Sequence, residues 1–199
     1  MPGYGDIDED YATRLATTEP DLDGPVWMVN LMHYKERAEY ADGRATELTG
    51  READDRYTPL GPLAAVGAEI VFAAEVEDQF LGDEPAWDRI AVVRYPTRAS
   101  FMAMQEREDF QALHEHKEAG MAQTFVIGTQ PLIDPIAEEV DWGEVPHPPT
   151  ADDGEYTVLH VLRFHDEGGA EQTPDHMASY QDAAGAVARL HGVRVDSTR

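Results

Sequence analysis

Apolar residues recur along the first two thirds of the chain in stretches that have the spacing of strands and helices. Residues 26–34 are almost continuously apolar, which favours a strand covered on both faces. The stretch "TGRE" at 49–52 has the spacing of a capping box and predicts a helix start. That helix should be bent or interrupted near Pro59 and Pro62 and should end at Gly67. The remaining predicted elements are strands at 68–76 and 87–95, helices at 98–106 and 107–119, and a strand at 123–132.

The order of these elements predicts an α+β fold with a ferredoxin-like sheet. Strand, helix, two strands, helix and strand follow one another within residues 24–133, which is the split βαβ signature. Residues 1–23 are polar and acidic, and we interpret them as an N-terminal arm with at most a short helix around 8–16. Residues 134–153 are rich in proline and acidic side chains, which is typical of a linker.

The C-terminal part of the chain resembles the start of this domain. The stretch "GEYTVLHVLRFHDE" at 154–167 repeats the apolar positions of "GPVWMVNLMHYKER" at 24–37 without a gap. Thr173 and Pro174 then provide an N-cap hydroxyl and a proline at the first helical position. We interpret 154–199 as a partial second ferredoxin-like repeat with a βαβ pattern. The pattern fits either a fragment of a two-copy protein or a half-repeat that packs on the first copy.

Composition narrows the possible functions. The sequence has 40 Asp and Glu against 15 Lys and Arg, and the net charge of −25 opposes binding to phosphate backbones, so we expect no nucleic-acid partner. It contains no cysteine, which excludes disulfides and thiolate chemistry. No apolar run is long enough to span a membrane, and the acidic N-terminus lacks an apolar signal segment. We therefore expect a cytoplasmic protein that has no membrane partner.

Candidate chemistry begins on the first strand. Alternation places Asn30, Met32 and Tyr34 on one face. Asn30 is an amide within an apolar run, and it either bonds neighbouring backbone or donates into a ligand cavity. Met32 would line the same cavity. Tyr57, on the first predicted helix, would present its phenol to that cavity or pack with its hydroxyl at the rim.

His114 and His116 are the candidate proton donors or acceptors. They are two residues apart on a predicted helix, so they point in different directions and form a poor chelating pair. No metal site is expected from them. An imidazole titrates near neutrality, which suits proton transfer, but either ring could also be a satisfied surface or core side chain.

Trp87 and Asp88 open the third predicted strand. The indole is either an apolar anchor beside a carboxylate that accepts backbone N–H groups, or a platform for a ligand. The sequence contains no phosphate-binding loop and no dinucleotide fingerprint, so no cofactor is expected.

Several of these stretches together resemble the DUF1330 family of the dimeric α+β barrel superfamily. They are "VNLMHYK", "TGREA" at 49–53, "FLG" at 80–82, Trp87-Asp88 and "FQALHEHK" at 110–117. The resemblance extends over residues 26–132 and implies two four-stranded sheets that meet face to face in a homodimer, with a pocket between sheet and helices. Lys117 departs from the family pattern, in which many members have Arg. The family carries no assigned activity.

Two classes of function follow. The first is a cofactor-independent oxygenase or isomerase that holds a small hydrophobic carbonyl or aromatic ligand over Asn30, with His114 or His116 transferring a proton. The second is a non-catalytic binding or assembly module, in which the apolar interior is core and the dimer is the product. Polar groups that converge on an open apolar cavity would favour the first class.

Heme chemistry is a minor alternative. The stretch at 100–117 also resembles a helix of heme-degrading monooxygenases, and Asn30 and His114 fall at the positions of the Asn and His of those enzymes. Met104 stands where they have Trp, and the chain has few cations to pair with heme propionates.

Removal of the second repeat should destabilise what remains. We predict a strand at 155–164 and a helix at 174–190 that pack on the first copy, in the same chain or in a dimer mate. Apolar side chains of that strand would each lose about 1.5–3 kcal/mol if left exposed. A chain that ends at residue 133 should therefore melt at a lower temperature or aggregate, as calorimetry and light scattering would show. Equal stability and solubility would identify the repeat as an independent appendage.

Overall fold

The computed structural model describes residues 8–82, 84–130, 146–147, 150–152, 157–161 and 179. The chain divides into two compact units, Met1–Gln130 and Pro131–Arg199. The helices and strands below belong to the first unit.

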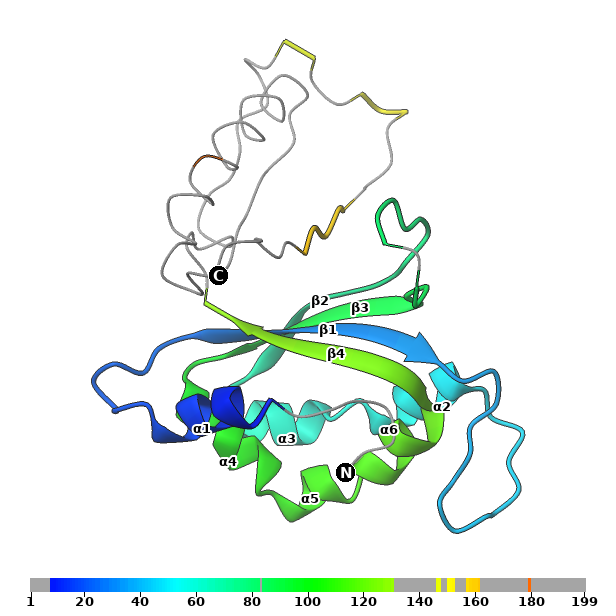
Figure 1. The fold of residues 1–199 in the computed structure, drawn as a ribbon, viewed down its shortest axis with the longest axis horizontal. Coiled ribbons are helices and arrows are strands. Elements are labelled where there is room, and N and C mark those ends of the chain that lie inside the picture. Colours follow the sequence, from blue (N-terminus) through cyan, green and yellow to red (C-terminus); the bar gives the residue numbers. More distant parts are fainter. Residues whose placement is uncertain are drawn as a thin grey trace. The chain divides into compact units, whose positions relative to one another are not determined.

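A four-stranded antiparallel sheet forms the first unit, in the order β2-β3-β1-β4 (Figure 1). The strands are β1 (Val26–Tyr34), β2 (Glu69–Glu75), β3 (Arg89–Tyr95) and β4 (Met121–Thr129). The first strand is central and pairs with both β3 and β4. This arrangement confirms the predicted α+β, ferredoxin-like fold.

Six helices lie on one face of this sheet (Figure 1). They are α1 (Glu9–Thr17), α2 (Gly50–Tyr57), α3 (Leu60–Ala65), α4 (Arg98–Gln105), α5 (Glu108–Gln111) and α6 (His114–Gly120). The capping box at Thr49 and Glu52 is present, and the helix it starts is interrupted before Pro59, as the sequence predicts. The helix predicted at 107–119 is likewise two short helices.

The two faces of the sheet carry separate apolar clusters. Met28 points to the helices and packs in a core with Val26, Leu63 and Phe110. On the opposite face Val29, Leu31 and Val92 are buried, and partly buried apolar side chains pack against them, which are Trp27, Val71, Phe72, Trp87, Ile90 and Ile127.

The residues before β1 pack as part of the same unit. Leu15 of α1 is buried in the helix-side core. The carboxylate of Asp23 accepts hydrogen bonds from the backbone N–H groups of Arg98 and Ala99, at 2.8 and 3.0 Å, and so caps the start of α4. The acidic segment predicted as an arm thus contributes a helix and a cap to this unit from residue 8 onward.

The predicted second repeat falls almost entirely outside the described residues. Of the strand predicted at 155–164, residues 157–161 are described, and they are exposed and have no strand pairing. An apolar pattern alone does not provide the backbone partner that a strand requires. Of the helix predicted at 174–190 only Ser179 is described, and it is helical. The predicted linker at 134–153 also lies mostly outside these residues.

Two glycines allow α2 and α6 to touch through their backbones. A Cβ on Gly50 would overlap the carbonyl oxygens of Gly120 and Lys35, and a Cβ on Gly120 would overlap the carbonyl oxygen of Gly50. The Lys35 N–H donates to the Gly120 oxygen at 2.9 Å, and the Gly50 N–H donates to the Lys35 oxygen at 3.1 Å. Both helices are therefore joined to the end of β1, where only glycine fits.

Gly120→Ala should destabilise the protein, whereas the same substitution at Gly61 should not. The alanine methyl at 120 meets backbone, which cannot move aside cheaply, and overpacking of this kind costs about 1–3 kcal/mol. Gly61 lies in α3 with open space around it, so alanine there should stabilise the helix by about 0.5–1 kcal/mol. Urea unfolding measures both changes. If both substitutions changed the free energy of unfolding by the same amount, the α2–α6 contact would tolerate a methyl group.

Candidate functional site

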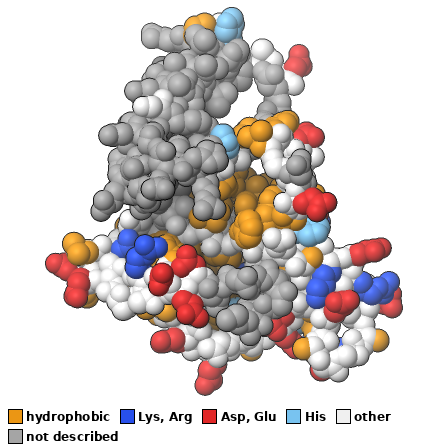
Figure 2. Space-filling view, in the orientation of Figure 1, with side chains coloured by type: hydrophobic (Ala, Val, Ile, Leu, Met, Phe, Trp, Pro, Cys, Tyr) orange, Lys and Arg blue, Asp and Glu red, His pale blue; other side chains and the backbone are white. Residues whose placement is uncertain are grey.

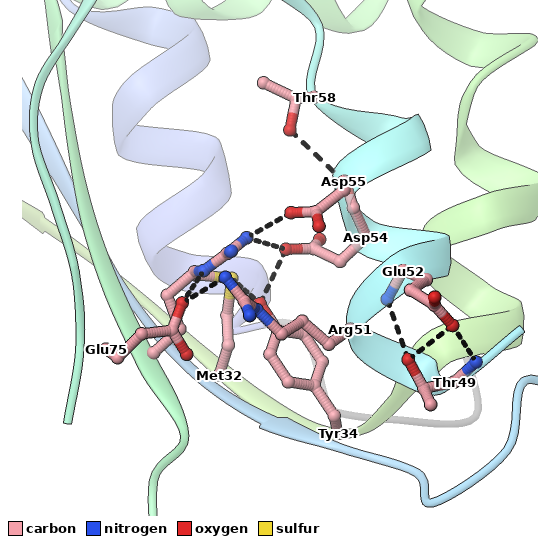
Figure 3. Close-up of polar contacts among 10 residues, drawn as sticks. Met32, Tyr34, Thr49, Arg51, Glu52, Asp54, Asp55, Thr58 and Glu75 are labelled. Atoms are coloured by element: carbon pink, nitrogen blue, oxygen red, sulfur yellow. Dashed lines mark hydrogen bonds and ion pairs between the residues drawn. The ribbon is translucent and has the colours of Figure 1, made fainter. Parts of the chain in front are cut away.

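A network of charged side chains lies between α2 and the strands at the end of β1. The Tyr34 hydroxyl donates to Oδ2 of Asp54 at 2.7 Å (Figure 3). Arg89, at the start of β3, lies with Nη1 2.8 Å from Asp55 and 3.5 Å from Asp54. The Asp54 side chain is buried, whereas that of Asp55 is exposed. The network therefore extends from solvent into the interior.

Glu75 connects this network to the edge of the sheet. Its Oε1 accepts from Arg89 Nε at 3.0 Å and pairs with Arg51 Nη2 at 2.7 Å (Figure 3). Because Arg51 is on α2 and Glu75 on β2, the helix is tied to the sheet by charge as well as by packing. Arg51 and Glu75 are about half-exposed, so solvent screens this pair.

Lys117 supplies a buried cation opposite Asp54. The side chain projects from α6, and only 7% of the residue is exposed. Burial lowers the pKa of Lys117, although the Asp54 charge opposes the change. Burial in turn raises the pKa of Asp54, against the Tyr34 hydrogen bond and the Lys117 and Arg89 charges. Asp54 therefore binds a proton more readily than an aspartate in water does, and Lys117 releases its proton more readily than a lysine in water does.

His114 lies next to this pair and has an unsatisfied nitrogen. Its ring meets Phe110 and Tyr57 edge to face, with centroids 4.6 and 5.6 Å away. Its Nε2 is buried and has no hydrogen-bond partner among the described residues. Burial, followed by the Lys117 charge, lowers the pKa of His114, and the Glu118 charge opposes this. The imidazole is thus held in its neutral form.

Tyr57 joins His114 to Lys117. The Lys117 Nζ lies 4.9 Å from the centroid of the Tyr57 ring, within the range of a cation–π contact. The structure therefore places His114, Tyr57 and Lys117 side by side, with Asp54 and Tyr34 beyond them. A basic nitrogen, a buried cation and a phenol within one interior are suited to moving a proton and stabilising the negative charge that results.

His116 belongs to a separate group of side chains. Its Nδ1 shares a 2.7 Å hydrogen bond with the Tyr40 hydroxyl, and Arg44 lies over the Tyr40 ring at 3.7 Å from the centroid. Nε2 of His116 is 3.8 Å from Glu115. The two histidines point in different directions, as their spacing predicts, and only His114 faces the buried network.

The other predicted site residues are divided between the two faces. The Asn30 amide donates to the backbone oxygens of Met28 and Ala91, at 3.0 and 3.4 Å, which corresponds to a sheet amide satisfied by backbone. Met32 is buried beside Tyr34, whose hydroxyl is 3.8 Å from its sulfur. Trp87 packs in the cluster on the opposite face of the sheet, away from these residues.

Sequence reasoning missed the residues that define the network. Strand alternation predicts the face of Tyr34 correctly. Asp54 and Arg89, however, look like ordinary surface charges in the sequence, and Lys117 is distinguished only as a departure from the pattern of the family that the chain resembles. The available signal was the scarcity of lysine: Lys35 and Lys117 are the only two in the chain.

Neither metal binding nor membrane insertion gains support from the described residues. Within them, no three His, Asp or Glu side chains are grouped in a way that could hold a metal ion. The same residues include no helix that is both long and apolar enough to cross a bilayer.

Comparison with known proteins identifies a structural relative of unknown function. No family model and no curated protein sequence matches this chain. Crystal structures of RPA0582, a protein of unknown function from Rhodopseudomonas palustris, are similar to it. The methylated form is 28% identical with a TM-score of 0.58, and a second structure is 26% identical with a TM-score of 0.56. The matches cover 67% of this chain and 98% and 100% of RPA0582, so the relative shares the α+β fold of the first unit.

Proposed function

We propose that this protein binds a small hydrophobic carbonyl or aromatic compound between its sheet and helices, and that it transfers a proton to or from that compound. The observation that carries this proposal is the buried Nε2 of His114, for which the described part of the chain provides no hydrogen-bond partner. An unpaired buried polar atom costs about 1–3 kcal/mol. A ligand with a polar group at this position would satisfy it.

The neighbouring side chains support the same chemistry. A neutral His114 can accept a proton from a carbon next to a carbonyl group, and the negative charge then moves to the carbonyl oxygen. Lys117 and Tyr57 are the groups that would stabilise this oxygen. Return of the proton to a different carbon completes an isomerisation without any other reactant. In an oxygenase, dioxygen would react with the same carbanion.

Asn30 has a supporting role in this proposal. Its side-chain nitrogen is already committed to two backbone oxygens, which leaves its side-chain oxygen for a ligand. Met32 and Tyr57 would supply apolar contact. His116, bonded to Tyr40, is the weaker of the two histidine candidates.

A non-catalytic assembly module is the second candidate function. The apolar cluster on the face of the sheet opposite α1–α6 favours it, since Phe125 of β4, which pairs with Leu31 of this cluster, remains about half-exposed. A homodimer formed through this face is part of our proposal, and it is compatible with either function. A cytoplasmic location stays a prediction from the sequence.

Native mass spectrometry of the freshly purified protein tests both candidates. We expect the mass of a dimer and of a retained small molecule. A His114→Phe variant should lose the small molecule, because phenylalanine keeps the ring packing but offers no nitrogen. His116→Phe is the matched control and should retain it.

The retained compound then tests the chemistry. Incubated in heavy water, it should gain deuterium with the unmodified protein, and His114→Phe should slow this exchange by about 100-fold or more. A dimer without any retained compound would favour the assembly module. If both variants retained the small molecule, His114 would not be part of the site.

Acid should destabilise the unmodified protein more than it destabilises the His114→Phe variant. Because the pKa of His114 lies below its ordinary value of 6.5, the unfolded chain takes up this proton before the folded chain does as the pH falls. The resulting loss of stability begins as the pH drops through 6.5 and is absent in the variant. Urea unfolding at about pH 7.5 and about pH 5.5 gives the difference. The same loss in both proteins would contradict a buried neutral imidazole.

A further inference from the structure

Lys117 is a buried lysine without a close anionic partner. Only 7% of the residue is exposed, and its Nζ lies 4.9 Å from the centroid of the Tyr57 ring. Within the described part of the chain, no ion pair and no hydrogen bond is present for this nitrogen. The Asp54 carboxylate, which is bonded to Tyr34 and Arg89, acts on it through its charge. Because lysine is almost never buried without a close partner, this amine is more readily explained by a reaction than by stability.

His114 and Lys117 lie next to each other on α6. They are three positions apart, a spacing that brings two side chains to the same side of a helix. Tyr57 lies beside both, since its ring meets that of His114 edge to face with centroids 5.6 Å apart. Nε2 of His114 is buried and finds no hydrogen-bond partner among the described residues. One side of α6 therefore presents an amine and a proton acceptor to the same interior.

Burial favours the reactive form of the amine. A lysine attacks a carbonyl carbon only when it is neutral, and a desolvated lysine is neutral more often than one in water. Burial lowers the pKa of Lys117 and raises the pKa of Asp54, so the ammonium gives up its proton more readily. The only other lysine of the chain, Lys35, pairs instead with Glu39 at 3.2 Å. The two lysines therefore differ in the property that decides this chemistry.

We propose that Nζ of Lys117 forms an imine with a neutral aldehyde or ketone that binds between the sheet and the helices. This inference rests on the proposed function, which supplies a carbonyl compound and its place in the molecule. It gives the lysine a covalent role in addition to an electrostatic one. His114 remains the group that accepts a proton from the carbon next to the carbonyl carbon.

The reaction needs no oxidant, reductant or other reactant. The ammonium first releases one proton, and the lone pair of the neutral amine then forms a bond to the carbonyl carbon. The carbonyl oxygen leaves as water, and the two hydrogens of that water balance the two that the amine nitrogen loses. The released proton returns to the imine nitrogen. This charged nitrogen takes the place of the carbonyl oxygen, because it accepts the electron pair when His114 removes a proton from the neighbouring carbon.

The surroundings select an uncharged and apolar carbonyl compound. The net charge of −25 repels anions at long range, and the Asp54 charge acts on Lys117 itself. The Tyr57 ring lies beside the amine, and the Phe110 ring lies 4.6 Å from that of His114 between centroids. Aromatic neighbours of this kind favour an aromatic aldehyde or ketone over an anionic keto acid.

Reductive trapping on the unmodified full chain tests the inference. The protein is incubated at about pH 7.5 with phenylacetaldehyde and cyanoborohydride, whose hydride converts an imine into a stable secondary amine. Mass spectrometry of proteolytic fragments then locates the added group. We expect Lys117 to be labelled about tenfold faster than Lys35 or more, because each unit by which a lysine pKa falls raises its neutral fraction about tenfold. The comparison is between the two lysines, since the N-terminal amine reacts as well.

The same labelling in concentrated urea is the control. Unfolding returns both lysines to water and should abolish the preference for Lys117. Equal labelling of Lys117 and Lys35 in the folded protein would overturn the inference, as would labelling of Lys35 alone. A preference that persists in urea would also overturn it, because the cause would then be neighbours in sequence and not burial.

Deuterium exchange separates this inference from the proposed function. In heavy water the unmodified protein should introduce deuterium next to the carbonyl group of phenylacetaldehyde. Lys117→Arg keeps the positive charge but cannot form an imine, so it should slow the exchange by about 100-fold or more, whereas Lys35→Arg should not. Unchanged exchange in Lys117→Arg would overturn the covalent role and leave the proposed function intact. Trapping at Lys117 without any exchange would support the imine and contradict proton transfer by His114.

Discussion

The backbone contact between Gly50 and Gly120 is the constraint on which the candidate site depends. The hydrogen bonds of Lys35 to both glycines join the start of α2 and the end of α6 to the chain as it leaves β1. Asp54 lies one turn into α2, and Lys117 lies one turn before the end of α6. Because both helices are fixed at the same point, these side chains meet in the interior beside Tyr34. A larger residue at either glycine would separate the elements that carry them.

A buried pair of lysine and aspartate generally contributes little to the stability of a fold. Removing each ion from water costs several kcal/mol, and their attraction repays this only when further hydrogen bonds are present. Tyr34 and Arg89 supply such bonds to Asp54. Around Lys117 the described neighbours include the face of the Tyr57 ring. Replacement by well-packed apolar side chains would often cost nothing, so the network is more readily explained by what it can bind than by stability.

The sequence was sufficient to predict the fold because the elements of this domain are defined locally. The apolar run at 26–34, the capping box at Thr49 and the N-cap at Thr97 each specify an element from neighbouring residues. The site depends instead on contacts between distant residues. Tyr34 and Asp54 are 20 positions apart in the sequence, and His33 and Asp88 are 55 apart. The spacing of apolar residues does not predict which of these polar side chains will contact each other. The apolar pattern at 157–161 repeats that of a strand, but these described residues have no strand pairing, and the second repeat stays a prediction.

The end of β1 connects the two faces of the sheet. Successive side chains point to opposite faces, so His33 and Tyr34 enter different environments although they are adjacent in sequence. Asp88 contacts both, because its Oδ2 accepts the backbone N–H of Tyr34 and the ring N–H of His33. The Tyr34 hydroxyl in turn donates to Asp54. Asp88 therefore holds the two adjacent residues that face opposite sides of the sheet, and Tyr34 links this point to the buried network. These three hydrogen bonds all lie within the first unit.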